Sequence, residues 1–216
     1  MKIISKAIGL LFAGIILLNC TGCGGTNIFT ERSLINEQAI ALIENQVISI
    51  ESAADDIFIY QGDSEGIEIK EYISSSSTQE SFVSCEDDGK TLNIKAVDNN
   101  KNFLIIGSNY RYVEIYLPKS YSNALAVQTA GANISCDTNT NCTKITLTTT
   151  SGNITVNTQT SDSFIFDAKT KSGEIYITNN DGFSYNEDAT AVNGMVGKNP
   201  LYTITAQTES GNINLH

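Results

Sequence analysis

The sequence predicts an all-β protein, a single-stranded right-handed parallel β-helix (β-solenoid) with coils of about 20–21 residues. Three observations predict it. One octapeptide occurs four times, apolar residues alternate on both sides of it, and its copies are almost evenly spaced. The copies begin at Thr129, Thr149, Thr170 and Thr208, so successive starts lie 20, 21 and 38 positions apart. The last separation equals one period of 21 plus an insertion of 17.

Each copy contains a polar bend, which we interpret as the corner of one coil. The pattern is Thr-x-Ser-Gly-[Asn/Glu]-Ile, and glycine permits backbone geometry that a side chain disfavours. The first copy has Gly131-Ala132 where the others have Ser-Gly, so its corner is expected to differ slightly. The predicted corner residues are Thr129, Thr149, Ser151, Gly152, Thr170, Ser172, Gly173, Thr208, Ser210 and Gly211.

Apolar residues alternate with polar ones before and after every corner. This period of two predicts a strand, a sharp bend and a second strand, with one face of each strand inward. Coils stacked about 4.8 Å apart would place equivalent residues above one another in continuous columns. An antiparallel sandwich is the alternative, but its hairpins favour Asn-Gly or Asp-Gly turns. The inward columns are Leu125, Ile145, Phe166, Ile204; Val127, Leu147, Ala168, Ala206; Ile134, Ile154, Ile175, Ile213; and Cys136, Val156, Ile177, Leu215.

Further strands are expected nearer the N-terminus. Short alternating apolar runs occur at residues 48–50, 57–59, 67–69, 92–94 and 113–117. Residues 31–45 fit either a short amphipathic helix or an initial strand, and we favour a helix or an irregular cap there.

The first residues are typical of a secretory signal. Lys2 and Lys6 precede an uncharged, mostly apolar stretch of twelve residues that ends at Leu18. Such a stretch is too short to cross a membrane comfortably as a helix. The segment that follows resembles the lipobox of bacterial lipoproteins. Cys23 comes after the small residues that the motif requires, so we favour it for diacylglycerol attachment, and Cys20 is the alternative.

A lipid on Cys23 would divide the chain into three parts. Residues 1–22 would be the lipoprotein signal peptide, 23–45 a lipid-anchored tether and N-terminal cap, and 46–216 the β-helix domain. Two or three acyl chains give stable membrane attachment. A secreted protein without lipid remains the alternative.

The chain is strongly acidic. Removal of residues 1–22 takes away two lysines and no acid, so the formal charge changes from −11 to −13. This charge argues against nucleic acid as a partner. The acidic clusters at 55–56, 63–65 and 86–88 lack the spacing of a calcium loop, so we expect no metal and no cofactor.

Two further features leave alternatives open. Cys136 lies in an inward column, where it would pack as a small apolar residue, yet a disulfide between Cys136 and Cys142 is also feasible. The insertion at 179–200 interrupts the repeat. It could be a strand pair or lip that protects an exposed edge, or a loop that binds a partner.

An enzyme is not expected. The only histidine, His216, is the last residue, so a catalytic triad has no base in an ordered region. β-Helical enzymes that act on carbohydrate need clustered carboxylates, whereas Glu174 and Glu209 belong to different copies of the repeat.

Several segments resemble the putative-adhesin family, a bacterial domain of unknown function. They are Ile57-Phe-Ile59, the stretch from Val113 to Lys119, and the repeated Thr-x-Ser-Gly-[Asn/Glu]-Ile units, and the likeness covers residues 45–216. The resemblance implies a secreted or membrane-attached β-helix, sometimes linked to envelope-stress operons, with no catalytic residues. We therefore expect a lipid-anchored, extracytoplasmic module that binds an envelope protein or a glycan. The alternatives are an accessory role in envelope-stress sensing through a membrane protein and, third, a carbohydrate-active enzyme.

Overall fold

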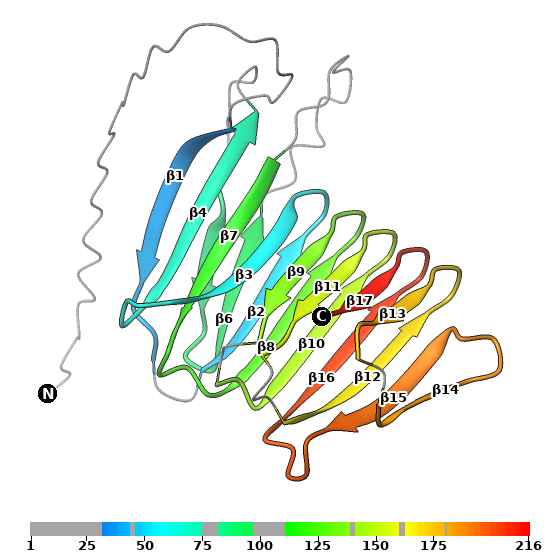
Figure 1. Cartoon of the computed structure of the whole chain (residues 1–216). Coiled ribbons are helices and arrows are strands. Elements are labelled where there is room, and N and C mark those ends of the chain that lie inside the picture. Colours follow the sequence, from blue (N-terminus) through cyan, green and yellow to red (C-terminus); the bar gives the residue numbers. More distant parts are fainter. Residues whose placement is uncertain are drawn as a thin grey trace, which may run out of the picture.

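The computed structural model describes residues 32–43, 46–74, 82–96, 111–138, 141–159, 163–179 and 181–216. Within these ranges every regular element is a β-strand, which confirms the all-β class. The strands form two mixed sheets, called sheet A and sheet B, which lie face to face along one elongated body (Figure 1).

Sheet A has eight strands and sheet B has nine. In spatial order, sheet A consists of β1 (Arg32–Ile40), β4 (Ile67–Ser74), β7 (Arg111–Pro118), β3 (Asp56–Gly62), β9 (Ile134–Asp137), β11 (Ile154–Asn157), β17 (Ile213–Leu215) and β13 (Ile175–Ile177). Sheet B consists of β14 (Phe183–Tyr185), β15 (Ala191–Val196), β12 (Phe164–Thr170), β16 (Tyr202–Thr208), β10 (Lys144–Thr149), β8 (Ala124–Thr129), β2 (Val47–Ser52), β6 (Thr91–Ala96) and β5 (Ser84–Asp87).

The core lies between the two sheets. Inward side chains of both sheets form one hydrophobic cluster, in which Ile145 of β10 and Ile154 of β11 are completely buried. The predicted columns lie in this cluster, and Ile177 of β13 is the one member that is only partly buried. The alternation of apolar residues is therefore the local cause of the two-layer packing.

The middle of the molecule is a stack of parallel coils, each made of one strand of sheet B followed by one strand of sheet A. Equivalent repeat positions lie opposite one another. Thr149 of β10, for example, is in register with Thr129 of β8 on one side and with Thr208 of β16 on the other. Six coils are present in the described residues: β6–β7, β2–β3, β8–β9, β10–β11, β16–β17 and β12–β13.

The coils are not stacked in the order of the sequence, as a regular β-helix would require. The last coil, β16–β17, lies between β10–β11 and β12–β13, and both of its strands are parallel to both neighbours. Figure 1 shows this directly, because the red strands stand between yellow-green and gold ones. The chain passes over one position, builds the outer coil, and returns to fill the gap.

The N-terminal end follows the same path in reverse. Coil β2–β3, the first in the sequence, lies between coil β8–β9 and coil β6–β7. The chain forms β4 and β5 before it forms the outer coil, β6–β7. At this end β4 is antiparallel to β7, β1 is antiparallel to β4, and β5 is antiparallel to β6. The prediction of a regular, fully parallel β-helix is therefore wrong at both ends of the stack.

The expected helix or irregular cap at 31–45 is also wrong, because residues 32–40 form β1. The strand pairs along its length with β4, and its register shifts between Leu34 and Asn36. This bulge breaks the period of two, which is why the sequence pattern did not identify a strand. The open edge of β4 supplies backbone hydrogen bonds that outweigh a weak helical tendency.

The insertion forms a strand pair at the other end of sheet B. β15 is antiparallel to β12, and β14 is antiparallel to β15. Phe183 of β14 packs edge-on against Phe166 of β12, with ring centroids 6.1 Å apart, and Val192 of β15 is buried. The hairpin therefore covers the edge of the outermost coil in sheet B, as the edge-protecting alternative predicted.

The corner threonines link each turn to the next coil. In coil β10–β11 the Thr149 hydroxyl accepts a hydrogen bond from the Gly152 backbone N–H (3.1 Å) and donates one to the Ala132 carbonyl (3.2 Å). Thr208 and Thr170 repeat both contacts with the glycines of their own and the neighbouring coils. All of these hydroxyls are buried, so each hydrogen bond satisfies a polar group that water cannot reach.

A second ladder runs along the residue that follows the glycine. The side-chain oxygen of Asn133 accepts from the Asn153 N–H, that of Asn153 from the Asn212 N–H, and that of Asn212 from the Glu174 N–H, each at 2.9 Å. Asp56 of the preceding coil accepts from the Asn133 N–H at 2.7 Å. Glu174 ends this ladder because its coil is the outermost.

The corner glycines are required by close stacking of backbones. A Cβ atom on Gly152 would lie 1.9 Å from the Ala132 carbonyl oxygen, whereas one on Gly131 would meet nothing closer than 3.5 Å. We expect Gly152→Ala to lower the free energy of unfolding by roughly 2–4 kcal/mol, because the coils must move apart.

Gly131→Ala is the matched control for this prediction, since it places the same methyl group on an adjacent turn. Urea unfolding followed by circular dichroism would give both values. Equal stability losses in the two variants would contradict the stacking argument.

Candidate functional site

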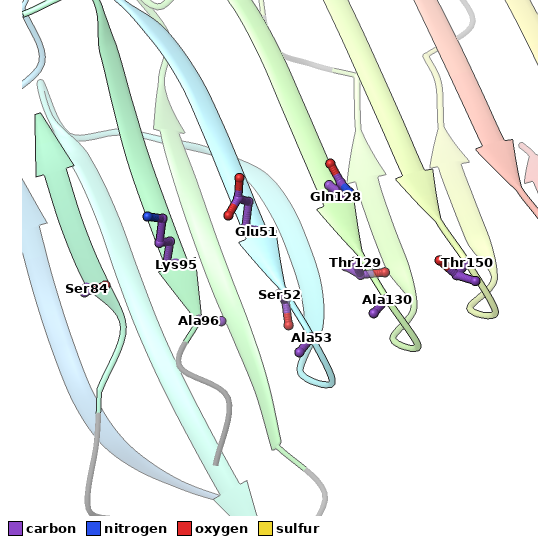
Figure 2. Close-up of a pocket in the computed structure, with 10 residues that line it drawn as sticks. All are labelled: Glu51, Ser52, Ala53, Ser84, Lys95, Ala96, Gln128, Thr129, Ala130 and Thr150. Atoms are coloured by element: carbon purple, nitrogen blue, oxygen red, sulfur yellow. The ribbon is translucent and has the colours of Figure 1, made fainter. Parts of the chain in front are cut away.

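An open groove lies on the outer face of sheet B, where strands β6, β2 and β8 approach their turns. Its volume is about 600 Å³. Figure 2 shows Lys95, Glu51 and Gln128 side by side on these three strands. Its lining residues are Glu51, Ser52, Ala53, Ser84, Lys95, Ala96, Gln128, Thr129, Ala130 and Thr150.

The register of the parallel strands places the three long polar side chains together. Glu51 is directly opposite Lys95 on one side and Gln128 on the other. Lys95 forms an ion pair with Glu86 of β5, with the Nζ and Oε2 atoms 3.5 Å apart. Among the described residues, the Glu51 carboxylate and the Gln128 amide make no hydrogen bond or ion pair with the protein. No described residue therefore competes with a ligand for these two groups.

The groove is one end of a longer polar row. Thr148 is in register with Gln128, Gln207 with Thr148, and Lys169 with Gln207. Together with Lys95 and Glu51 they form the outer row, which crosses six strands. Five strand spacings correspond to a length of about 24 Å. The row thus presents carboxylate, amide, hydroxyl and ammonium groups at regular intervals.

A second surface lies on the outer face of sheet A. Outward positions of strands normally carry polar residues, as Ser135, Thr155 and Asn214 do in the middle of this sheet. On β3, β7 and β4 several of the outward positions carry aromatic rings instead. The aromatic face consists of Phe58, Tyr60, Tyr72, Tyr112 and Tyr116.

The side chains of the aromatic face interact with one another and with neighbouring charged residues. The rings of Tyr72 and Tyr112 stack with centroids 4.7 Å apart, and the Tyr116 hydroxyl donates to Glu114 at 2.9 Å. The cations of Arg32 and Lys70 lie over the rings of Tyr112 and Tyr116 at 4.9 and 5.1 Å. These contacts connect three strands, so most of the interactions that this face can form are already made within the protein.

The environment of this face favours the neutral form of three of its phenols. Burial, followed by the charge of Glu114, raises the pKa of Tyr72 to about 12. Burial and Glu114 also raise the pKa values of Tyr60 and Tyr116. A phenol in the unfolded chain ionises near pH 10.

These shifts predict a loss of stability in alkali. Between about pH 10 and 12 the unfolded chain loses the Tyr72 proton while the folded chain retains it, so the free energy of unfolding falls as the pH rises. Below pH 10 the contribution is constant. Urea midpoints measured from pH 8 to pH 12 should fall less steeply in Tyr72→Phe than in the wild type.

Phe58→Leu is the control for this pH dependence, because it disturbs the same cluster without removing a titrating group. It should lower the midpoint equally at every pH. Identical pH slopes for the wild type and Tyr72→Phe would show that the phenol does not contribute.

A buried charge network holds the N-terminal end together. Glu71 of β4 is completely buried, and its Oε2 atom lies 2.7 Å from Nη2 of Arg111. Its Oε1 atom accepts from the Asn36 side chain at 2.6 Å and from the Val83 N–H at 2.9 Å. The Nε atom of Arg111 lies 2.9 Å from Oδ2 of Asp55, a close ion pair that is not aligned as a hydrogen bond.

The cysteines form no disulfide in the described part of the chain. Cys136 and Cys142 are both buried beside each other, and burial raises the pKa of the Cys136 thiol. Burial and the charge of Glu71 raise the pKa of Cys85 to about 11. The bridge that the sequence left open between Cys136 and Cys142 is therefore absent.

The predicted site residues separate into three groups. The corner residues line one edge of the stack, and only Thr129 among them also lines the groove. Cys20, Cys23 and the proposed signal peptide lie outside the described residues. His216 is exposed, and its Nδ1 atom lies 3.0 Å from the Thr178 hydroxyl.

The groove, the aromatic face and the buried network were not expected from the sequence. The outward positions of the predicted strands would have indicated the aromatic face, because residues 58, 60, 112 and 116 alternate with core residues. Among the residues described, no cluster of three or more histidine, cysteine or acidic side chains could hold a metal ion. That same part of the chain contains no helix able to cross a membrane.

A solved structure with a TM-score above 0.5 agrees with this architecture. The chain is similar to a putative cell adhesion protein from Clostridium sporogenes, with a TM-score of 0.60 and 13% identity over 83% of this chain and 98% of that one. A putative adhesin from Bacteroides fragilis aligns with a TM-score of 0.30 and 10% identity over 87% and 99% of the two chains. No protein with a curated description matches the sequence.

A sequence family covers most of the chain. The profile of the Toastrack DUF4097 family matches twice, over residues 45–158 and 137–216. The two matches overlap over residues 137–158, which contain coil β10–β11, so together they span all six parallel coils. The protein is therefore a member of the Toastrack DUF4097 family.

Proposed function

We propose that this protein is a lipid-anchored, extracytoplasmic, adhesin-like interaction module of the bacterial cell envelope. The observation that carries the proposal is the family match over residues 45–216, together with a fold shared with a putative cell adhesion protein. The N-terminal sequence supports the location, since a charged start, a short apolar stretch and a lipobox-like segment precede the folded domain.

The architecture suits a rigid display scaffold. The stack of parallel coils would act as a right-handed β-helical rod, the hand that parallel crossover connections almost always take. Such a rod holds its outer faces in fixed register, which is useful for presenting a binding surface away from a membrane. The partner would be an envelope protein or a glycan.

A catalytic role fits the groove poorly. Hydrolysis of a glycosidic bond requires two carboxyl groups on either side of the scissile bond. Among the described residues that line the groove, Glu51 is the only carboxylate, and the cation of Lys95 is engaged by Glu86. We therefore propose binding without turnover.

The anchoring part of the proposal can be tested by substitution of each candidate cysteine. We expect Cys23→Ser to abolish lipid labelling and release the protein from the membrane fraction, whereas Cys20→Ser should leave both unchanged. Mass spectrometry of the mature N-terminus gives the readout. A mature protein that starts elsewhere and carries no acyl mass would overturn the anchor.

The interaction part needs a separate test on cells. A strain that lacks the protein should attach less well to host or neighbouring cell surfaces, and the wild-type gene should restore attachment. A Cys23→Ser gene should not restore it, even when the protein accumulates. Unchanged attachment in the deletion strain would contradict the adhesin-like role.

A further inference from the structure

Of the two unusual outer surfaces, the groove is the one whose polar groups include some without a partner among the described residues. On the aromatic face the rings stack on one another, Glu114 accepts a hydrogen bond from the Tyr116 hydroxyl, and two cations already lie over rings. In the groove, Glu51 and Gln128 stand next to each other without partners among the described residues. A surface with unused hydrogen-bonding groups in a hollow is the better candidate for a ligand site.

We propose that the groove on sheet B binds a neutral linear glycan, which lies across the strands along the outer row. This inference rests on the proposed interaction role and names its ligand class. The hydroxyl groups of a sugar can donate to the Glu51 carboxylate and both donate to and accept from the Gln128 amide. Ser84 and Thr150 add hydroxyl groups on either side of the groove.

The described residues of the groove argue against two other ligand classes. Among the described residues that line it, no aromatic or large aliphatic side chain is present, so these residues would contribute little to the binding of an apolar molecule. Its two charged residues, Glu51 and Lys95, carry opposite signs and lie in register. The whole chain has a formal charge of −11, so a polyanion would be repelled. The ligand class that the groove favours is therefore neutral and rich in hydroxyl groups.

The shape of the site favours a chain rather than a single sugar. The groove is open, and the outer row continues from it through Thr148 and Gln207 to Lys169. Because parallel strands are evenly spaced, the row repeats its polar groups at about 4.8 Å intervals over about 24 Å. A linear polymer could therefore contact several strands at once, which adds affinity for each further sugar that it spans.

Binding can be measured with the mature full-length protein in detergent and a defined set of sugars. The neutral probes are cellohexaose, chitohexaose and isomaltohexaose, the anionic probe is hexagalacturonate, and each is compared with its monosaccharide by calorimetry. We expect at least one neutral hexamer to bind, and to bind about tenfold or more tightly than its monomer. Hexagalacturonate should not bind.

Two groove variants locate the site, and one pair of substitutions on the opposite face serves as the control. Glu51→Ala with Gln128→Ala removes the unused polar groups, and Ala130→Trp blocks the groove from an exposed position. Each should weaken binding about tenfold or more, which corresponds to loss of one or two hydrogen bonds. Thr155→Ala with Asn214→Ala, a neighbouring outward pair on sheet A, should bind as the wild type does.

The outcomes are decisive for this site. Absence of binding to every neutral hexamer, preference for hexagalacturonate, or unchanged binding in both groove variants would each overturn the proposal. Urea midpoints of the variants verify that they are folded. Because the assay uses purified protein, it is independent of membrane anchoring and cell attachment, so failure here would leave the adhesin-like role to stand on its own tests.

Discussion

Removal of residues 202–216 is expected to abolish cooperative folding of the whole domain. In a regular solenoid the last coil is an end, and its loss shortens the rod by one unit. Here the last coil is internal, because β16 and β17 each pair with strands on both sides. Its removal would separate coil β12–β13 and the hairpin β14–β15 from the rest of the stack.

The size of the loss can be judged from the buried side chains. Ile204 and Ile213 are completely buried, and Leu215 is almost so. Each is worth about 1.5–3 kcal/mol of burial, so the three together contribute roughly 5–9 kcal/mol. A domain of this kind has a total stability of about 5–15 kcal/mol. The truncated chain should therefore show no cooperative urea transition and should expose apolar surface to a fluorescent dye.

A hairpin deletion of similar size provides the control. Removal of residues 182–197 takes away β14 and β15 and leaves an eight-residue connection, comparable with residues 158–163 between β11 and β12. This variant loses only the cover of one edge, so it should still unfold cooperatively, at a lower urea midpoint and with lower solubility. A truncated chain that unfolds as cooperatively as the hairpin deletion would refute the internal position of the last coil.

Replacement of Arg111 by methionine is expected to cost about 3–5 kcal/mol of stability. The substitution leaves the Glu71 carboxylate fully buried without its cation, and it also removes the contact with Asp55. The two remaining donors, Asn36 and the Val83 N–H, cannot compensate a full charge. Equilibrium urea unfolding would measure the change.

The double variant separates charge from packing. Glu71→Gln in the Arg111→Met background removes the uncompensated charge, so the double variant should be more stable than Arg111→Met alone. Lys119→Met is the surface control. It breaks an exposed ion pair with Asp63 of similar length, 2.6 Å, and should change stability within the error of the measurement. A double variant no more stable than Arg111→Met would show that the network acts through packing.

Much of the local structure was predictable from the sequence. The alternation around each corner identified the buried columns, because a strand alternates its side chains between two faces whatever strand lies next to it. The runs at 48–50, 57–59, 67–69, 92–94 and 113–117 all lie within strands. The same reasoning failed at residues 32–40, where a bulge near Leu34 interrupts the alternation.

The order of the coils had one signal in the sequence that became clear only with the structure. Three copies of the repeat carry asparagine after the corner position, whose side chain accepts a backbone hydrogen bond from the next coil. The third copy carries Glu174 instead. Coil β12–β13 is the outermost, so no further coil donates a backbone hydrogen bond to its corner. An amide acceptor is therefore not needed there, and the exception marks the end of the stack.

The candidate site was less predictable than the fold. Glu51, Lys95 and Gln128 come from three strands separated by up to 77 residues, and nothing in their local sequence relates them. They lie together because β2 pairs with both β6 and β8. This strand order is set by the path of the chain at its N-terminal end. The buried pair of Glu71 and Arg111 has the same origin.

The sequence by itself determined which residues face inward, where the chain turns, and that repeated units stack with equivalent residues in register. These properties follow from local geometry and from the burial of apolar side chains, both of which are encoded within one coil. Only the tertiary structure decided which coils are neighbours, because equivalent coils offer nearly equivalent edges to one another. That choice places the last coil inside the stack, closes one sheet edge with a hairpin, and brings the groove residues onto one surface.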